Sequence, residues 1–298
     1  MAGWDDVLKE IKEAPSAIDV IRRKYLLQLH ELTHRNVIAY YSGWLTKNNI
    51  VDLDINDNDL NGFMNAIKGL DCGLGLDLIL HTPGGSPVAA EGIVKYLRSK
   101  FKTDIRIIVP QLAMSAGTMI ACSSREIIMG KHSFLGPIDP QFNGIPAHSI
   151  RLEYENAKRD LDEHPENFNY WKILLSKYPA AFTKVVLDAI DLSNILATEW
   201  LGSAMFDSKN ENDSPIIANI VYNLCNNEDN KSHGRHLDVS YLKSIGLKIL
   251  ELEADSTLQD AVLSVHHAFM CLVNSGHVIK IIENHNGKAI INSIIGKQ

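Results

Sequence analysis

The sequence predicts an α/β fold built on a parallel sheet, and three observations lead to this class. Short apolar segments rich in β-branched residues, typical of buried strands, recur at residues 35–41, 76–81, 105–110 and 126–129. Helical patterns lie between these segments, at residues 60–70, 88–100 and 115–122. Strands and helices that alternate in this way favour parallel βαβ units.

The remaining sequence is mainly helical and ends in a hairpin. We expect helices at residues 4–13, 18–32, 216–225 and 258–273, and a mainly helical stretch at 151–206. Two apolar segments flank Asn286-Gly287, which is a strong hairpin turn. We therefore predict one domain over residues 1–298, divided into an α/β core (35–150), a helical arm (151–250) and a C-terminal helix and hairpin (251–298).

Composition excludes several classes of protein. Of the 298 residues, 45% are hydrophobic and 22% charged, and the net charge is −7. This composition is typical of a globular domain. The sequence contains no run of basic residues that would indicate nucleic-acid binding. No apolar run reaches the roughly 18 residues of a membrane span, and the first residues do not resemble a signal peptide. Four scattered cysteines fit a reducing compartment, so we expect a cytoplasmic protein.

A glycine-rich turn follows the strand at 76–81. It reads Thr82-Pro83-Gly84-Gly85, and a helix begins just after it. Two glycines let the backbone turn sharply and leave amide hydrogens uncovered, where they can hold an anion or a developing oxyanion. Taken alone, the motif is that of an ordinary strand-to-helix turn. A phosphate loop is disfavoured, because no Gly-Lys-Ser/Thr follows.

A serine stands at the start of the helix at 115–122. Ser115 lies in Met114-Ser-Ala-Gly-Thr118, where small neighbours leave its hydroxyl open to a reactant. The helix dipole favours negative charge at this position, as a nucleophile needs. Alone, the pattern is also that of a serine N-cap in a closely packed helix. The G-x-S-x-G elbow of α/β-hydrolases is absent.

Together the two motifs resemble those of a known family. The matching segments read LDLILHTPGG and VPQLAMSAGTMIACSSREIIMGKHSFLGPIDPQ. They resemble the serine dehydrogenase proteinase family, which is related to signal peptide peptidase A and, more distantly, to the proteolytic subunit of the Clp protease. The close resemblance covers residues 76–146, and a looser one continues to about residue 250. It implies a Clp protease/crotonase-like fold of repeated ββα and βαβ units.

The resemblance implies a serine peptidase that needs no metal or other cofactor. Ser115 would be the nucleophile that forms an acyl-enzyme, and the amides of Gly85 and Ala116 would form the oxyanion hole. Asp139 would orient a base or line the substrate groove, or it caps a turn. The groove would also include Gly84 and Ser86. An extended peptide or unfolded protein would bind as an added strand beside the glycine turn.

The resemblance leaves two kinds of general base open. Ile138 occupies the position of the histidine in the Clp subunit, and His132 precedes the strand that would carry it. Relatives of signal peptide peptidase A use a lysine, whose pKa falls readily on burial. We select Lys177, which has apolar and aromatic neighbours, as the base of a Ser-Lys dyad. The other lysines considered are Lys158, Lys172 and Lys184.

Two alternative functions and one expected assembly remain. The same fold serves crotonase-type enzymes, in which the oxyanion amides would stabilise an acyl-CoA enolate and Asp139 would be the acid/base. A non-catalytic oligomeric scaffold of this fold is the other alternative. Relatives enclose their active sites in rings or stacks, so we expect a homo-oligomer. His233 and His236, and His266 and His267, lack zinc-site spacing, and we interpret them as surface histidines.

Overall fold

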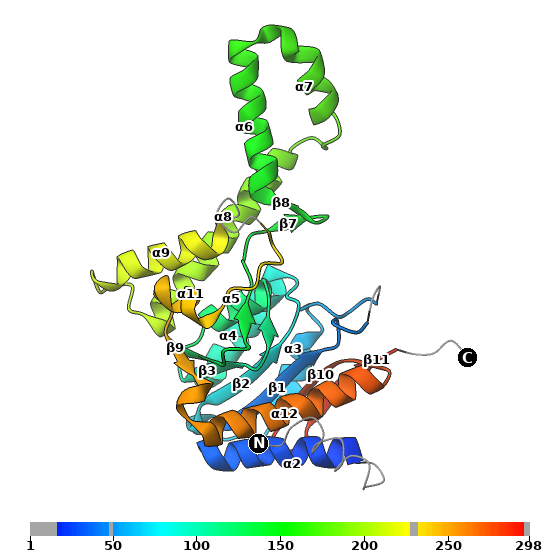
Figure 1. Ribbon diagram of the computed structural model, residues 1–298, viewed down its shortest axis with the longest axis vertical. Coiled ribbons are helices and arrows are strands. Elements are labelled where there is room, and N and C mark those ends of the chain that lie inside the picture. The colour runs from blue at the N-terminus through cyan, green and yellow to red at the C-terminus, as the bar shows by residue number, and fades with distance from the viewer. Residues whose placement is uncertain (1–16, 48–49, 227–231, 295–298) are drawn as a thin grey trace.

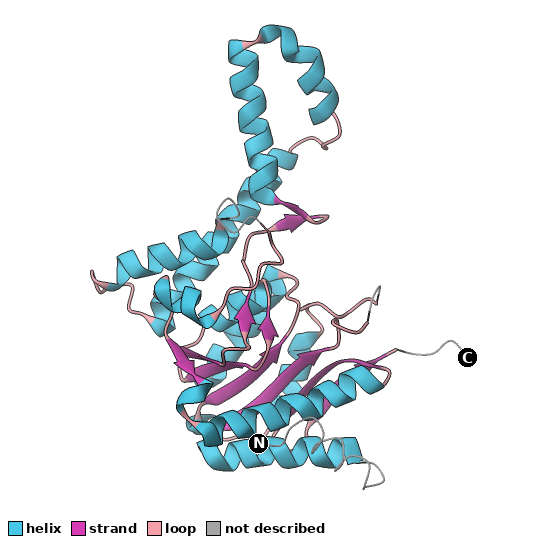
Figure 2. Ribbon diagram, in the orientation of Figure 1, coloured by secondary structure: helices cyan, strands magenta, loops and turns pink. Residues whose placement is uncertain are grey.

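The computed structural model describes residues 17–47, 50–226 and 232–294, and its centre is one mixed sheet (Figures 1 and 2). The sheet has seven strands in the spatial order β11 (Ala289–Ser293), β10 (Val278–Asn284), β1 (Asn36–Ser42), β2 (Leu76–His81), β3 (Ile105–Val109), β5 (Glu126–Met129) and β9 (Ile249–Glu251). The α/β class and the four predicted core strands are confirmed. The helix expected at residues 4–13 lies outside the described residues.

Strand direction divides the sheet in two. Strands β1, β2, β3, β5 and β9 are parallel, whereas β10 runs antiparallel to β1 and β11 antiparallel to β10. The predicted C-terminal hairpin is therefore confirmed as β10–β11. In this hairpin, β10 pairs with β1, so the last two strands of the chain join the sheet beside the first strand. Local sequence patterns did not predict this pairing.

Helices cover both faces of the sheet, as Figure 1 shows. One face packs against α2 (Ala17–Thr33) and α12 (Ser256–Ser275), and the other against α3 (Asp59–Ile67), α4 (Pro87–Phe101) and α5 (Ala116–Cys122). Strand residues alternate between the two cores because successive side chains point to opposite faces. In β1, Ile38 and Tyr40 join the core beneath α3–α5, and Val37 and Ala39 join that beneath α2 and α12.

A helical arm projects from the α3–α5 side (Figure 1). It consists of α6 (Ala147–Glu163), α7 (Phe168–Leu175) and α8 (Phe182–Trp200), which confirms the mainly helical stretch at 151–206. Two further helices, α9 (Asp213–Cys225) and α11 (Val239–Ser244), contribute buried residues to the core on this side of the sheet. The division of the chain at residues 150 and 250 stays a prediction. Within the described residues, no helix has the length and apolar character needed to cross a membrane.

Four short strands lie between the sheet and the arm. They are β4 (Leu112–Ala113), β6 (Phe134–Leu135), β7 (Gln141–Phe142) and β8 (Ile145–Pro146). β4 pairs with β6 in parallel, and β7 with β8 in antiparallel orientation. Single-turn helices lie at Cys72–Leu74, Pro165–Asn167 and Leu252–Ala254, and a π-helical turn at Leu201–Met205 follows α8.

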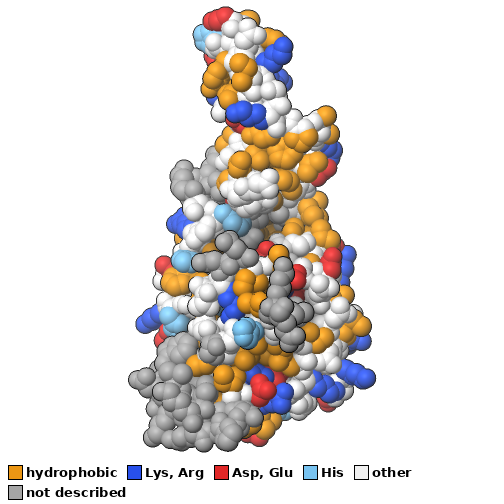
Figure 3. All heavy atoms as spheres, turned by 90° about the vertical axis from the view of Figure 1, so that its right-hand side faces the viewer, with side chains coloured by type: hydrophobic (Ala, Val, Ile, Leu, Met, Phe, Trp, Pro, Cys, Tyr) orange, Lys and Arg blue, Asp and Glu red, His pale blue; other side chains and the backbone are white. Residues whose placement is uncertain are grey.

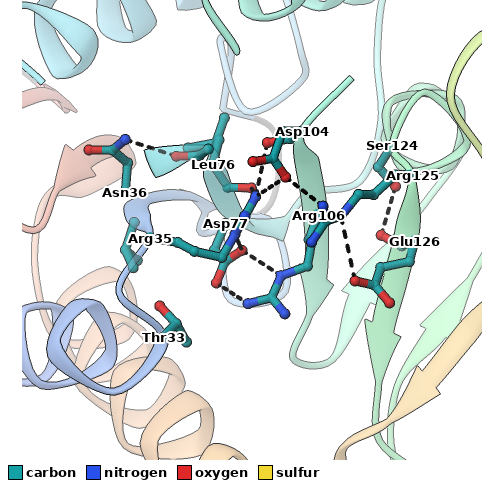
Figure 4. A network of polar contacts seen from close by, with 12 residues as sticks. Thr33, Arg35, Asn36, Leu76, Asp77, Asp104, Arg106, Ser124, Arg125 and Glu126 are labelled. Atoms are coloured by element: carbon teal, nitrogen blue, oxygen red, sulfur yellow. Dashed lines mark hydrogen bonds and ion pairs between the residues drawn. The ribbon is translucent and has the colours of Figure 1, made fainter. Parts of the chain in front are cut away.

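Buried charges join the strands at the end of the sheet where the parallel strands begin (Figure 4). Asp77 of β2 is fully buried and receives hydrogen bonds from Arg35 Nε at 2.7 Å and from Arg106 Nε and Nη2 at 2.7 and 2.6 Å. Arg35 also donates to the carbonyl oxygens of Leu76 and Asp104. These bonds connect β2 with β3 and with the residue before β1, which fixes the parallel register.

Candidate active site

The glycine turn and the Ser115 segment lie side by side at the opposite end of the parallel strands. The Thr82 amide donates to Leu112 O at 3.1 Å, and the Met114 amide donates to Thr82 O at 3.0 Å. These two bonds form a parallel bridge between the residue after β2 and the residues of β4. The two motifs, about thirty residues apart in the sequence, therefore meet in the fold.

Ser115 has an unusual backbone conformation. Its φ is 50° and its ψ is −114°, which a residue with a side chain rarely adopts. Gly84 makes room for this turn, because a Cβ there would lie 2.6 Å from Met114 O and 2.7 Å from Ser115 Cβ. Strain held at a nucleophile between a strand and a helix exposes its hydroxyl. Among the described residues, the Ser115 side chain has no hydrogen-bond partner.

The orientation of the Gly85 amide follows from its partner segment. Gly84 O accepts a hydrogen bond of 2.7 Å from the Ile55 amide, and the Ser86 amide donates to Ile55 O at 2.9 Å. The peptide between Gly84 and Gly85 is trans, so its N–H points away from its C=O. Because the C=O points toward Ile55, the Gly85 N–H points away from Ile55. No described residue accepts a hydrogen bond from it.

The Ala116 amide is the second unpaired donor. Ala116 is the first residue of α5, so its N–H has no acceptor within the helix, and no other described residue accepts from it. Gly117 and Met119, next along, donate to Met114 O at 2.8 Å and Ser115 O at 3.1 Å. Two free amides therefore flank Ser115, the arrangement an oxyanion hole requires.

A cavity of about 380 Å³ unites these groups. Gly85, Ser115, Ala116 and Asp139 line it, four of the residues that the sequence singled out. Its remaining wall is largely apolar and comes from α5, α8 and the loop between β6 and β8; it includes Met119, Ile138, Pro140, Phe142, Ala189 and Leu192. Asp54 and His233 add polar groups. The cavity can hold an apolar side chain next to the Ser115 hydroxyl.

An Asp–His pair faces the same cavity. The buried Asp139 carboxylate lies 2.8 Å from His233 Nδ1, and its other oxygen accepts a 2.7 Å bond from Gln141 Nε2. His233 itself is 31% exposed in its side chain. A carboxylate at Nδ1 favours the tautomer with the proton on Nδ1, which leaves the Nε2 lone pair free to accept a proton. The pair therefore has the chemistry of an oriented general base.

Long-range pairing brings His233 to this position. Leu135 in β6 and Leu237 exchange hydrogen bonds of 3.1 and 2.8 Å, so the loop before α11 runs beside the strand that leads to Asp139. Sequence reasoning interpreted His233 as a surface histidine and missed this contact. Asp139 and His233 are 94 residues apart, and no local spacing links them. The only signal in the sequence was an aspartate enclosed by two prolines, Gly136-Pro-Ile-Asp-Pro140.

The other predicted site residues lie at or beyond the edge of the cavity. Gly84 packs directly against Ser115. Ser86 is the N-cap of α4, and its hydroxyl accepts a hydrogen bond of 3.2 Å from the Ala89 amide. Lys177 is exposed in the turn after α7 and does not line the cavity. Within this chain, the structure therefore does not bring Lys177 to Ser115. Its role as base stays a prediction.

A metal site finds no support in the part of the chain that the structure describes. No group of three or more His, Cys, Asp or Glu side chains there could hold an ion. The His236 ring lies tilted beside that of Phe134, with ring centroids 5.2 Å apart, and His266 is buried against Tyr41. The interpretation of His266 as a surface residue was therefore wrong: its side of α12 packs onto the sheet.

Comparison with known protein families gives one match. Residues 21–166 match the model of a family described as ClpP-like SDH-type serine proteinases. The match contains the glycine turn, Ser115 and Asp139, whereas Lys177 and His233 lie outside it. It confirms the predicted family resemblance and the Clp protease-like fold.

Individual relatives are less informative. Two uncharacterized proteins of Methanocaldococcus jannaschii are 43% and 40% identical over 102 and 106 residues, which are 34% and 35% of this chain and 35% and 36% of theirs. The chain thus spans about a third of the length of these curated relatives. One solved structure, of a mutant membrane-bound stomatin-specific protease, is 18% identical and covers 67% of this chain and 92% of its own, with a TM-score of 0.30.

Proposed function

Residues 21–166 belong to the ClpP-like SDH-type serine proteinase family, and we propose that this protein is a serine endopeptidase with Ser115 as nucleophile and His233 as general base. One observation carries the proposal. A strained serine, two unpaired amides and a histidine held by a buried carboxylate all face one cavity. The geometry thus favours a Ser-His-Asp triad over the Ser-Lys dyad predicted from the sequence.

Each group has a defined task in peptide hydrolysis. His233 Nε2 accepts the proton of Ser115 as Oγ attacks the carbonyl carbon of the substrate. The carbonyl oxygen becomes an oxyanion, held by the N–H groups of Gly85 and Ala116. His233 then gives its proton to the departing amine, and the acyl group remains on Ser115. His233 then deprotonates a water molecule, whose oxygen attacks the acyl carbon. The ester bond to Ser115 Oγ breaks, the acid is released, and His233 returns its proton to Ser115 Oγ.

Asp139 supports these steps without touching the reactants. It lies 2.8 Å from His233 Nδ1 and stabilises the imidazolium that forms during each proton transfer. The apolar wall formed by Met119, Ile138 and Leu192 favours a substrate with an apolar side chain beside the scissile bond. The proposed substrates are peptides or unfolded proteins.

Casein cleavage by purified protein tests the nucleophile and the base together. We expect Ser115→Ala and His233→Ala to lose at least about 10³-fold in rate, as triad members do. Lys177→Ala should keep the wild-type rate. His236→Ala, three residues from His233 and also on the surface of this loop, is the matched control and should remain active. Loss of activity in Lys177→Ala but not in His233→Ala would restore the dyad.

A covalent probe extends the test to a protein that does not cleave casein unaided. A fluorophosphonate should label Ser115 in the wild type and in Lys177→Ala, and should fail to label Ser115→Ala. An absence of labelling at Ser115 would contradict the peptidase proposal and favour the acyl-CoA or scaffold alternatives, which do not require a nucleophilic serine.

We also propose that the protein forms a homo-oligomer through its arm. Helix α7 is mostly apolar, yet none of its residues is buried against the described chain, and Phe168, Tyr170 and Ile173 are 57%, 60% and 66% exposed. Figure 3 shows hydrophobic side chains at the surface of the arm and its base. Exposed apolar patches commonly mark protein interfaces.

The cysteines bear on the compartment in which the protein works. Four free thiols support a reducing compartment, and we propose the cytoplasm.

A further inference from the structure

A buried ion pair lies behind the glycine turn. Lys280 of β10 and Asp59, the first residue of α3, are 2% and 1% exposed in their side chains, and their charged atoms are 2.8 Å apart. Such a pair adds little to stability over an apolar pair of the same volume, because both charges must lose their hydration. The charged atoms do, however, form directional hydrogen bonds, and each can therefore hold specific backbone groups in place.

Both charges bind the backbone just before α3. Lys280 Nζ donates to Asp54 O at 2.6 Å. Asp59 Oδ2 accepts from the Asn56 amide at 3.0 Å and from the Tyr40 hydroxyl at 2.9 Å. Ile55, which lies between these two anchored residues, is therefore fixed on both sides.

Ile55 is the residue that orients the oxyanion turn. Its amide and its carbonyl bond to Gly84 O and to the Ser86 amide, and a Cβ on Gly85 would lie 2.4 Å from both Ile55 N and Ile55 O. The Gly85 N–H can point away from Ile55 only while this backbone pairing persists. A chain of direct contacts thus runs from Lys280 to the predicted oxyanion donor.

We propose that Lys280 and Asp59 are positioning residues that orient the Gly85 amide for catalysis by clamping the backbone of residues 54–56. The inference rests on the proposed function for its catalytic consequence, but the clamp itself can be measured separately. It assigns a catalytic task to the C-terminal hairpin, which contributes no residue to the cavity lining.

The test compares two buried ion pairs on the same strand. Lys280→Met removes the bond to Asp54 O and leaves the Asp59 carboxylate without its countercharge. The double variant Lys280→Met/Asp59→Asn removes the same bond and both charges, so that no unpaired buried charge remains and the fold is retained. The matched control is Glu283→Gln, because Glu283 of β10 forms a fully buried ion pair with Arg22 that does not touch residues 54–56.

Two measurements separate the clamp from the chemistry. Hydrogen–deuterium exchange of peptides containing the Ile55 and Ser86 amides should become about tenfold faster in the double variant, and should stay near the wild-type rate in Glu283→Gln. In hydrolysis of p-nitrophenyl butyrate, kcat should fall about tenfold or more with KM little changed, since the oxyanion forms only after binding.

Each failure has its own signature. Unchanged exchange at Ile55 and Ser86 in the folded double variant would overturn the clamp, whatever the activity. Faster exchange with an unchanged kcat would overturn its catalytic role. Equal hydrolysis by wild type and Ser115→Ala would instead overturn the proposed function. A parallel loss of kcat in Glu283→Gln would show a general effect of destabilising β10, and would also overturn the inference.

Discussion

At the end of the sheet where the parallel strands begin, the buried charges are fully paired. Asp77 accepts three hydrogen bonds from two arginines (Figure 4). At the end where the same strands finish, the Gly85 and Ala116 amides lack partners among the described residues, and Ser115 has a strained backbone. Both ends are built from the same strands, so the contrast lies in how the polar groups at each end are paired.

The contrast between paired and unpaired polar groups indicates which end of the sheet is available to bind a ligand. Buried polar groups that have hydrogen-bond partners within the chain stabilise the fold and have no capacity left to bind a ligand. Unsatisfied donors and a strained residue each cost free energy, and they persist only where the surrounding structure forces them. The cavity at the second end therefore combines unused hydrogen-bonding capacity with access for a ligand. Substitutions at three positions test this contrast.

The largest expected effect is at Ser115. Ser115→Gly and Ser115→Ala should both abolish peptidase activity, by at least about 10³-fold. Their stabilities should differ, however, because glycine adopts a φ of 50° freely and alanine does not. We expect Ser115→Gly to be more stable than Ser115→Ala by about 1 kcal/mol in thermal unfolding. Equal stabilities would show that the Ser115 conformation stores no strain.

The next effect concerns the other end of the sheet. Asp77→Asn leaves Arg35 and Arg106 without a buried countercharge, and should cost about 3–5 kcal/mol of unfolding free energy. Activity per folded molecule should not change, because β2 separates Asp77 from the cavity. Urea unfolding and casein cleavage measure the two quantities.

Asp104→Asn is the matched control for this network. Asp104 binds Arg35 and Arg125 but is 40% exposed in its side chain, so its loss should cost less than about 1 kcal/mol. A large loss of specific activity in Asp77→Asn would contradict the division of the sheet into a structural end and a reactive end.

Local patterns predicted the fold well because the core strands are short apolar runs with glycine or proline at their ends. The half of the candidate site that follows strands β2 and β4 could be proposed from the sequence, since a Gly-Gly turn and a serine among small residues have direct chemical meaning. The bridge between Thr82 and Ala113 then brings those two motifs together.

The other half of the site depends on contacts that no local pattern encodes. His233 reaches Asp139 through the pairing of Leu135 with Leu237, and Lys280 reaches Asp59 because the C-terminal hairpin joins β1. Lys177 shows the converse. The apolar residues next to Lys177 in the sequence suggested that it is buried. Lys177 lies instead on the projecting arm, where it is exposed to solvent.

The last effect is a pH dependence of stability near the candidate site. His81, the last residue of β2, precedes the glycine turn but points into the core under α12, among the rings of Tyr41, Trp44 and His266. Burial lowers the pKa of His81 to about 3. In the unfolded chain its pKa is near 6.5, so below that pH the unfolded state binds the extra proton and the native state does not.

Stability should therefore fall as the pH drops from about 6.5 to 3, with His81 contributing about 1.4 kcal/mol per pH unit. Burial also lowers the pKa of His266, so both imidazoles act in the same direction. His81→Phe keeps an aromatic ring and removes one titrating group, so its urea-unfolding free energy should decline less steeply over this range. Parallel curves for the two proteins would mean that His81 becomes protonated in the folded state, and that this part of the reactive end is open to solvent.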